Sequence, residues 1–222
     1  LFLSASSRHP DGLANSSGLV GKNLMFNGYS QTWAEFSEPL NEYKSIVATR
    51  VVMDFYDSDS SRGFYGGGGI DARATPGPLF WGVVDNPIPG ASTWGSGFKA
   101  QLRKYVYTMA AAGHSTSLPV ETNTLDPNLT DAWGRPGIRV TYMDHPDDLA
   151  FATFLQDRAV EIMEAAGAAK VTRVPVVPST VAAHLLGTCR MGNDPRMSVV
   201  DRDHRAHDVP NLFMCDGSSL VT

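Results

Sequence analysis

The stretch that decides how this chain is interpreted is its C-terminal segment, residues 179–222, which reads STVAAHLLGTCRMGNDPRMSVVDRDHRAHDVPNLFMCDGSSLVT. His184 lies shortly before a Gly-Thr-Cys tripeptide (187–189), and a second turn-forming group, Asp-Gly-Ser, follows at 216–218. Both groups combine chemically capable side chains with glycine, which lets backbone approach a ligand closely. We therefore expect the upstream chain to be the scaffold for this segment.

Two interpretations of His184 are open from the residue alone. Its neighbours are apolar or small, which is typical of a buried histidine whose ring is satisfied by a backbone carbonyl. Histidine is also the usual proton acceptor near neutral pH, and a partly buried imidazole stays neutral, as a base must. Gly187 would let the backbone come close to a flat ligand.

The Asp216-Gly217 pair is open to two interpretations as well. Residues 211–215 (NLFMC) predict a short strand running into a tight turn and a helix start. Such a turn can present N–H groups to an anion, and Asp216 can accept a hydrogen bond from a ribose or ribityl hydroxyl. An ordinary N-cap aspartate has the same pattern. A serine nucleophile is disfavoured because the chain has no G-x-S-x-G.

A metal hydrolase using His184, His204 and His207 is a weaker alternative. His-x-x-His spacing alone is not specific, and neither C-x-x-C nor H-E-x-x-H accompanies it. Two histidines in the run DRDHRAHD are typical of a solvated turn. We therefore expect no metal.

Composition restricts the class of protein. The chain has 222 residues, 42% hydrophobic and 18% charged, which is typical of a globular protein with a sizeable core. A formal charge of −5, without a Lys/Arg cluster, disfavours a nucleic-acid partner. Two cysteines cannot build a disulfide framework, and no apolar run reaches the roughly 20 residues of a membrane span.

The patterns upstream predict an α+β fold, a mostly antiparallel sheet flanked by helices. Extended structure is expected over 29–57, with its most strand-like part at 46–56, and further strands over 79–84, 120–129, 138–142 and 170–177. Helices are expected over 95–112 and 146–166. The second helix should bury Phe151, Leu155, Ala159, Ile162 and Ala166, and end at Gly167.

Two glycine-rich stretches are expected to be irregular. Residues 12–28 predict a loop pinned by its own side chains. The glycine run 66–69 predicts a bulge or a close backbone approach, because it lacks the context of a phosphate-binding loop.

Taken together, these residues resemble the glucose–methanol–choline (GMC) flavoprotein oxidoreductases. HLLGTCRMGNDPRMSVVDRDHRAHDVPNLFMCDGSSLVT (184–222) is similar to the family's C-terminal signature, H-x-x-G-T-x-R-M-G, S-V-V-D, then N-L-F-x-x-D-G-S. NSSGLVGKNLM (15–25) is similar to its S-G-x-V-G-R-N-L-M segment, and residues 125–150 to its entry into a long helix. The sugar and sugar-acid dehydrogenase branch is the most similar.

The resemblance implies roles for particular residues. His184 corresponds to the catalytic base, which takes the hydroxyl proton while a hydride passes from the alcohol carbon to flavin N5, and Asp216 and Gly217 to residues that contact FAD. Residues 1–28 then join the FAD-binding domain, residues 29–178 form the substrate domain, and residues 179–222 carry the catalytic histidine and the FAD-contacting segment.

Three departures from the family pattern matter. The glycine-rich FAD-binding unit is absent, and the expected second catalytic residue, a His or Asn, has no counterpart before Thr222. Asn27 stands where many members have His, and Lys22 replaces Arg. Both chain ends also lie in apolar segments, so we expect a piece of a longer protein whose FAD-binding portion is a missing partner.

The leading hypothesis is thus part of an FAD-dependent oxidoreductase acting on a CH–OH group of a sugar or another alcohol. A non-catalytic fragment or binding module of the same fold is the alternative. The residues of this chain do not indicate the electron acceptor, the substrate or the cellular location.

Overall fold

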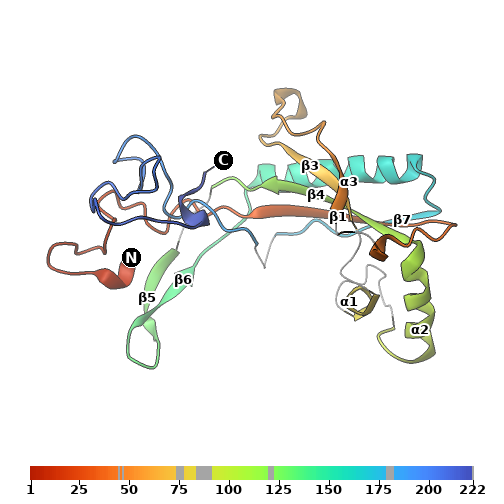
Figure 1. Ribbon diagram of the computed structural model, residues 1–222, viewed down its shortest axis with the longest axis horizontal. Coiled ribbons are helices and arrows are strands. Elements are labelled where there is room, and N and C mark those ends of the chain that lie inside the picture. The colour runs from red at the N-terminus through yellow and green to blue at the C-terminus, as the bar shows by residue number, and fades with distance from the viewer. Residues whose placement is uncertain are drawn as a thin grey trace. The chain divides into compact units, whose positions relative to one another are not determined.

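The computed structural model describes residues 1–44, 46, 48–73, 78–83, 92–119, 123–178 and 183–221. These residues form two compact units (Figure 1). Unit 1 comprises 1–27, 116–145 and 179–222, and unit 2 comprises 28–115 and 146–178. Residues 116–145 thus group with the C-terminal segment and not with the rest of the expected 29–178 substrate domain.

Unit 2 is built on a five-stranded sheet with the order β2-β3-β4-β1-β7. The pairings β1–β7, β2–β3 and β3–β4 are antiparallel, as the alternating sequence patterns predicted. The strands are β1 (Asn27–Glu35), β2 (Ala48–Val52), β3 (Gly68–Arg73), β4 (Thr108–Thr116) and β7 (Lys170–Arg173).

Helix α3 (Pro146–Ala165) covers one face of this sheet (Figure 1). Proline occupies its first position, two aspartates lie in its first turn, and Gly167 with φ +87° follows its end, as predicted. Its buried residues pack on Ala34, Ile70 and Ala111 of the sheet. This helix and strand arrangement confirms the α+β fold.

The buried stripe of α3 differs from the expected one at its C-terminal end. Met163 is buried, whereas Ile162 and Ala166 are exposed. Gln156 is also buried, and its amide donates to the backbone oxygens of Gln31 (2.8 Å) and Val174 (2.6 Å). The apolar periodicity could not predict this polar link between helix and sheet.

Two predictions of secondary structure in unit 2 are wrong. The run expected as a strand over 79–84 is helix α1 (Pro78–Val83), where Pro78 starts the helix. The helix expected over 95–112 stops at Lys104, where α2 (Gly95–Lys104) passes into a 3₁₀ turn (Tyr105–Tyr107) and then β4. Alanines favour a helix locally, but in β4 Ala111 packs in the core under α3, and Ala110 packs with Trp33 and Tyr105.

The glycine run 66–69 makes the close backbone approach that was expected. A Cβ atom added at Gly67 would lie 1.7 Å from the Tyr56 carbonyl oxygen, and one at Gly68 would lie 2.0 Å from that of His114. Short connections to the rest of unit 2 include the 3₁₀ turns Glu42–Lys44 and Ser60–Arg62.

Unit 1 has little regular structure. Its elements are the hairpin β5 (Asn123–Thr130) and β6 (Pro136–Val140), and the 3₁₀ turns Phe2–Ser4 and Gly217–Ser219. The strand expected over 211–215 is reduced to one bridge between Arg205 and Phe213. A small core holds the loops together, with Ala14, Val20, Cys189, Val199, Val200, Ala206 and Met214 buried.

The expected loop is confirmed over 12–26, whereas residues 27 and 28 of the predicted range begin β1. The loop's own side chains pin it. Asn15 accepts from the Val20 N–H (3.1 Å) and donates to the Asp11 carbonyl (2.9 Å). Residues 45, 47, 84, 120–122, 179–182 and 222 of the predicted segments lie outside the described residues.

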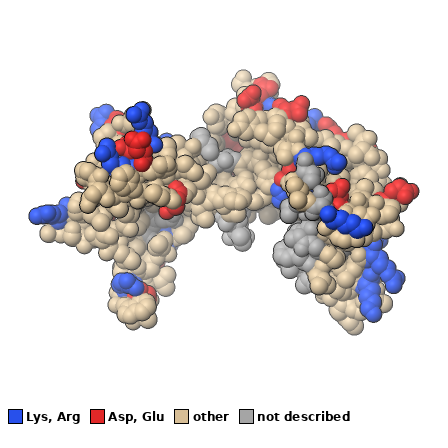
Figure 2. All heavy atoms as spheres, viewed as in Figure 1, with Lys and Arg blue, Asp and Glu red and all other residues tan. Residues whose placement is uncertain are grey.

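The surface is charged, and the described helices are not of the membrane-spanning kind. The face seen in Figure 2 mixes acidic and basic side chains, with Lys and Arg gathered along α2. Of the helices that the structure describes, none is both long and apolar enough to cross a membrane.

Candidate functional site

The segment that carries His184 is held against residues 21–27 by backbone hydrogen bonds. Met25 and Leu186 exchange both bonds, at 3.1 and 3.0 Å, and the Asn27 N–H donates to the Ala183 carbonyl at 3.0 Å. The two sequence stretches that resemble the GMC family therefore lie side by side in unit 1. This pairing fixes which residue faces His184.

Gly187 is required by this pairing. Its φ is +86°, and an added Cβ atom would lie only 2.2 Å from the Asn23 carbonyl oxygen. Any other residue would combine an unfavourable left-handed backbone with a clash against main chain. The glycine of H-x-x-G-T thus has a packing reason that is independent of any ligand.

His184 is exposed, and its ring contacts a side chain. Its backbone φ is +57°, uncommon for a residue with a Cβ, and such conformations cluster at functional sites. Its Nδ1 atom lies 3.1 Å from the Asn27 side-chain nitrogen. The alternative of a buried histidine satisfied by a backbone carbonyl is therefore wrong.

Because Asn27 contacts Nδ1 of His184, the other ring nitrogen, Nε2, is directed away from the Asn27 amide. Asn27 Nδ2 is a donor, so it pairs with the neutral ring that carries its proton on Nε2. The same amide, turned about its Cβ–Cγ bond, would present Oδ1 to an Nδ1–H group, and Nε2 would then be a base. An asparagine can hold both tautomers of His184, which a purely accepting carboxylate cannot.

The second predicted group, Asp216-Gly217, forms a capped turn. Asp216 has an extended backbone, and its carboxylate accepts from the Ser218 N–H at 2.8 Å at the start of the 3₁₀ turn. Hydrogen bonds from the side chain and the backbone N–H of Ser218 lower the pKa of the exposed carboxyl, which is therefore ionised at neutral pH. The N-cap interpretation is confirmed, and it leaves the carboxylate open to a further donor.

The structure brings the two predicted groups together. A Cβ atom added at Gly217 would lie 2.5 Å from the carbonyl oxygen of Leu185, the residue after His184. In addition, the Cys189 N–H donates to the Ser218 carbonyl at 2.7 Å. The histidine segment thus lies between residues 21–27 and the Asp216 turn.

His204 supports the Asp216 turn from below the surface. The Ser219 hydroxyl donates to the Asp216 carbonyl at 3.0 Å, so its oxygen is left to accept from His204 Nδ1 at 2.8 Å. Ser219 is fully buried. The sequence did not indicate this role, because the two partners are fifteen residues apart.

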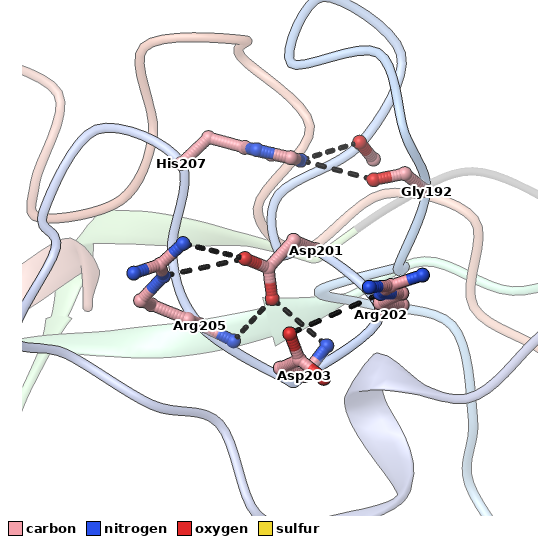
Figure 3. A network of polar contacts seen from close by, with 7 residues as sticks. Gly192, Asp201, Arg202, Asp203, Arg205 and His207 are labelled. Atoms are coloured by element: carbon pink, nitrogen blue, oxygen red, sulfur yellow. Dashed lines mark hydrogen bonds and ion pairs between the residues drawn. The ribbon is translucent and has the colours of Figure 1, made fainter.

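His207 has different partners (Figure 3). Its Nε2 atom lies 2.9 Å from the Ser198 hydroxyl and donates to the Gly192 carbonyl at 3.2 Å. Nearby, Asp201 accepts from the Arg205 guanidinium and from the Asp203 N–H. His184, His204 and His207 are thus each held by a separate partner. No cluster of three potential metal ligands occurs among the described residues.

Comparison with known proteins places this geometry in a family. Residues 119–222 match the family described as GMC oxidoreductase. The chain contains the C-terminal domain of a GMC oxidoreductase. The whole chain is also 36% identical to 2-methyl-1,2-propanediol dehydrogenase of Mycolicibacterium austroafricanum, over 100% of this chain and 41% of the relative.

Two further relatives have names that refer to sugars. The fructose dehydrogenase large subunit of Gluconobacter japonicus is 28% identical over 100% of this chain and 40% of its own length. The gluconate 2-dehydrogenase flavoprotein of Pantoea cypripedii is 27% identical over 99% and 38%. This GMC chain therefore spans about two fifths of the length of the curated relatives it matches.

Proposed function

We propose that the protein of which this GMC chain is part oxidises a CH–OH group of a sugar or another alcohol, with FAD as cofactor and His184 as the proton acceptor. The observation that carries the proposal is the exposed His184 ring, held at Nδ1 by Asn27 and adjoining the Asp216-Gly217 turn through Leu185.

His184 would bind the substrate hydroxyl through Nε2. Its ring orientation is set by Asn27 on one side and by the paired backbone of Met25 and Leu186 on the other. Nε2 can take the hydroxyl proton when Asn27 presents its amide oxygen to the Nδ1–H group, and general-base catalysis of this kind contributes about 10²–10⁴-fold. We therefore assign Asn27 the role of a positioning residue for His184.

Asp216 and Gly217 would contribute to holding FAD. An ionised, exposed carboxylate accepts hydrogen bonds from ribose or ribityl hydroxyls, and the missing side chain of Gly217 keeps the turn close to the Leu185 backbone. These residues fit part of such a cofactor, and the rest of its contacts would come from the portion outside this chain. Bound FAD would supply the hydride acceptor of the reaction.

The test is flavin reduction in the full-length protein, mixed anaerobically with fructose, gluconate or 2-methyl-1,2-propanediol. We expect at least one of them to bleach the flavin, and His184→Ala to slow that bleaching by about 10²–10⁴-fold. His9→Ala removes a histidine from elsewhere in unit 1 and serves as the matched control. Equal rates in His184→Ala and His9→Ala would remove His184 from the mechanism.

The non-catalytic alternative has its own outcome in that experiment. A full-length protein that binds FAD but is reduced by none of the three compounds, nor by a wider alcohol panel, would favour it. A metal hydrolase has no support among the described residues, because His204 and His207 both donate to protein acceptors.

A further inference from the structure

Two linked hydrogen bonds connect His204 to the Asp216 turn, and all of their atoms belong to unit 1. His204 Nδ1 donates to the Ser219 hydroxyl at 2.8 Å, and that hydroxyl donates to the Asp216 carbonyl at 3.0 Å. We refer to these two hydrogen bonds as the His204 relay. The relay leads from a residue without a role in proton transfer to the carboxylate that is proposed to contact FAD.

His204 is placed for this contact by the turn that carries it. The Asp201 carboxylate accepts from the N–H groups of Asp203 at 2.9 Å and Arg205 at 3.1 Å (Figure 3). The Asp201 carbonyl accepts from the His204 N–H at 3.0 Å. This turn holds His204 at φ +63°, a conformation that histidine, asparagine and aspartate adopt more readily than most other residues. Main-chain geometry therefore orients the ring toward Ser219.

His204 contacts the chain on both sides of Asp216. Its carbonyl accepts from the N–H of Met214, two residues before Asp216, at 2.9 Å. Its ring donates to Ser219, three residues after Asp216. The Asp216-Gly217 pair is therefore bracketed by two contacts of a single residue.

Ser219 is the buried link of the relay. Its side chain is fully buried, so its hydroxyl has no water to turn toward. The His204 N–H occupies the hydroxyl oxygen, which leaves the hydroxyl hydrogen for the Asp216 carbonyl. Hydrogen bonds that share one hydroxyl polarise and strengthen each other. Without the ring donor, the hydroxyl would be free to rotate away from Asp216.

The relay acts on the Asp216 carboxylate through the closure of the turn. The Ser219 hydroxyl closes the turn at the Asp216 carbonyl, and the Ser218 N–H within the closed turn donates to the carboxylate at 2.8 Å. If the turn opened, the Ser218 N–H would move away and the carboxylate would rotate. The direction in which Asp216 presents its remaining acceptor capacity thus depends on the relay.

The turn also has main-chain anchors that the relay does not supply. The Cys189 N–H donates to the Ser218 carbonyl at 2.7 Å, and the Met191 N–H donates to the Ser219 carbonyl at 2.9 Å. These bonds remain when a side chain of the relay is changed. We therefore expect relay variants to fold.

We propose that His204 is a positioning residue for FAD, because its Nδ1–H group, acting through Ser219, holds the Asp216 carboxylate where it accepts from a ribose or ribityl hydroxyl. The proposal rests on the proposed function, in which Asp216 contacts FAD. The relay requires a hydrogen-bond donor at the δ position of residue 204. His204 then controls the affinity for FAD, whereas proton transfer belongs to His184.

The test measures the dissociation constant of FAD in the full-length protein, by removing the flavin and titrating it back while its fluorescence is followed. His204→Asn and His204→Asp are a matched pair, since both residues tolerate positive φ and they differ only at one δ atom. Asparagine keeps a δ nitrogen donor, so His204→Asn should bind FAD within about twofold of wild type. Aspartate has only acceptors, so His204→Asp should weaken FAD binding about tenfold, the loss expected for one hydrogen bond.

Two further variants separate the relay from charge and from stability. Ser219→Ala removes the middle of the relay without adding a charge, and should also weaken FAD binding about tenfold. His207→Asn breaks contacts with Ser198 and Gly192, outside the relay, and should leave the FAD dissociation constant unchanged. Thermal unfolding of each apoprotein is recorded in parallel. If His204→Asp and Ser219→Ala lower only the unfolding temperature and bind FAD as His207→Asn does, the relay is structural and the proposal is overturned. Equal weakening in His204→Asn and His204→Asp would overturn it as well.

Asp216→Ala decides whether a failure belongs to the relay or to the proposed function. It should weaken FAD binding at least as much as His204→Asp. If Asp216→Ala binds FAD as wild type does, the FAD contact of Asp216 fails, and the role of His204 fails with it. If Asp216→Ala weakens FAD binding but neither His204→Asp nor Ser219→Ala does, only the relay proposal fails.

Discussion

Unit 1 and unit 2 are stabilised in different ways. In unit 2, a helix packs its apolar stripe on a sheet, and Phe151, Leu155 and Ala159 are almost wholly buried. In unit 1, loops are held by single backbone bridges and by aspartates that accept from nearby N–H groups. These aspartates are Asp126, Asp131, Asp194, Asp201 and Asp216.

The difference explains why the proposed catalytic residue lies in unit 1. A side chain on a packed strand has one orientation and little freedom, whereas a loop can place a residue such as His184 at positive φ and turn it outward. In unit 1, individual glycines and capping aspartates determine the conformation of the loops. Unit 2 is stabilised mainly by the apolar area that it buries, together with polar links such as that of Gln156 to the sheet and the ion pair of Arg73 with Asp71.

The largest effect should come from removing the central aromatic of unit 2. Phe151 is 1% exposed and packs against Phe64 and Phe154. We expect Phe151→Ala to cost about 3–5 kcal/mol in the full-length protein. Hydrogen exchange should show the loss of protection concentrated in unit 2 peptides.

Tyr56→Ala, at a residue 63% exposed, is the control for the Phe151 variant and should leave stability nearly unchanged. Equal loss of protection in peptides of 183–191 and of α3 would contradict the separation into a packed unit and a bridged unit.

A smaller effect should follow from one methyl group in unit 1. Gly187→Ala places a Cβ atom against the Asn23 oxygen at positive φ, and should cost about 2–4 kcal/mol. Gly18→Ala is the matched control, because Gly18 also has positive φ but nothing lies within 4 Å of its added Cβ. We expect that control to cost about 1 kcal/mol, the conformational penalty alone.

Urea unfolding of the Gly187 and Gly18 variants measures the difference between them. If Gly187→Ala and Gly18→Ala lower the free energy of unfolding equally, the close contact of residues 183–188 with residues 21–27 does not add to the cost of a side chain at position 187.

The smallest effect concerns the acid sensitivity of an ion pair in unit 2. The pKa of Asp71 is about 2 in the folded protein, below its ordinary 3.8, so its ion pairs stabilise the fold above about pH 4. This contribution, on the order of 2 kcal/mol, should be lost as the pH falls from about 4 to 2.

Between about pH 4 and 2, the free energy of unfolding should decrease less steeply with falling pH in Asp71→Asn than in wild type. Asp157→Asn removes an exposed carboxylate of α3 and should keep the wild-type steepness. If the free energy of unfolding of Asp71→Asn falls with pH as steeply as that of wild type, the contacts of Asp71 with Arg73 and His114 add no stability.

The sequence predicted the two units to different extents. The sequence pattern located α3 and predicted extended structure at β1, β2 and β7. It misassigned 79–84 and 108–112, where a short apolar run and an alanine run fit either helix or strand. Strand register, small side chains and packing against neighbouring elements determine the secondary structure that these segments adopt.

In unit 1, individual residues carried more information than periodicity. His184 and Asp216-Gly217 were located from their motif, and the structure places their segments in contact. The sequence marked Asn27 only as a departure from the family pattern, and its pairing with His184 required the antiparallel contact of residues 21–27 with 183–188. His204 gave no signal, because its partner Ser219 is distant in the chain.

The most direct test of the central claim is the rate of flavin reduction in the full-length protein at saturating alcohol, compared among wild type, Asn27→Ala and His184→Ala. His184→Ala removes the proposed acceptor of the hydroxyl proton, so its rate should fall by about 10²–10⁴-fold. Asn27→Ala keeps the imidazole and loses only its hydrogen-bond partner, so its rate should fall by less. A near wild-type rate in His184→Ala would contradict the assignment of His184 as the base.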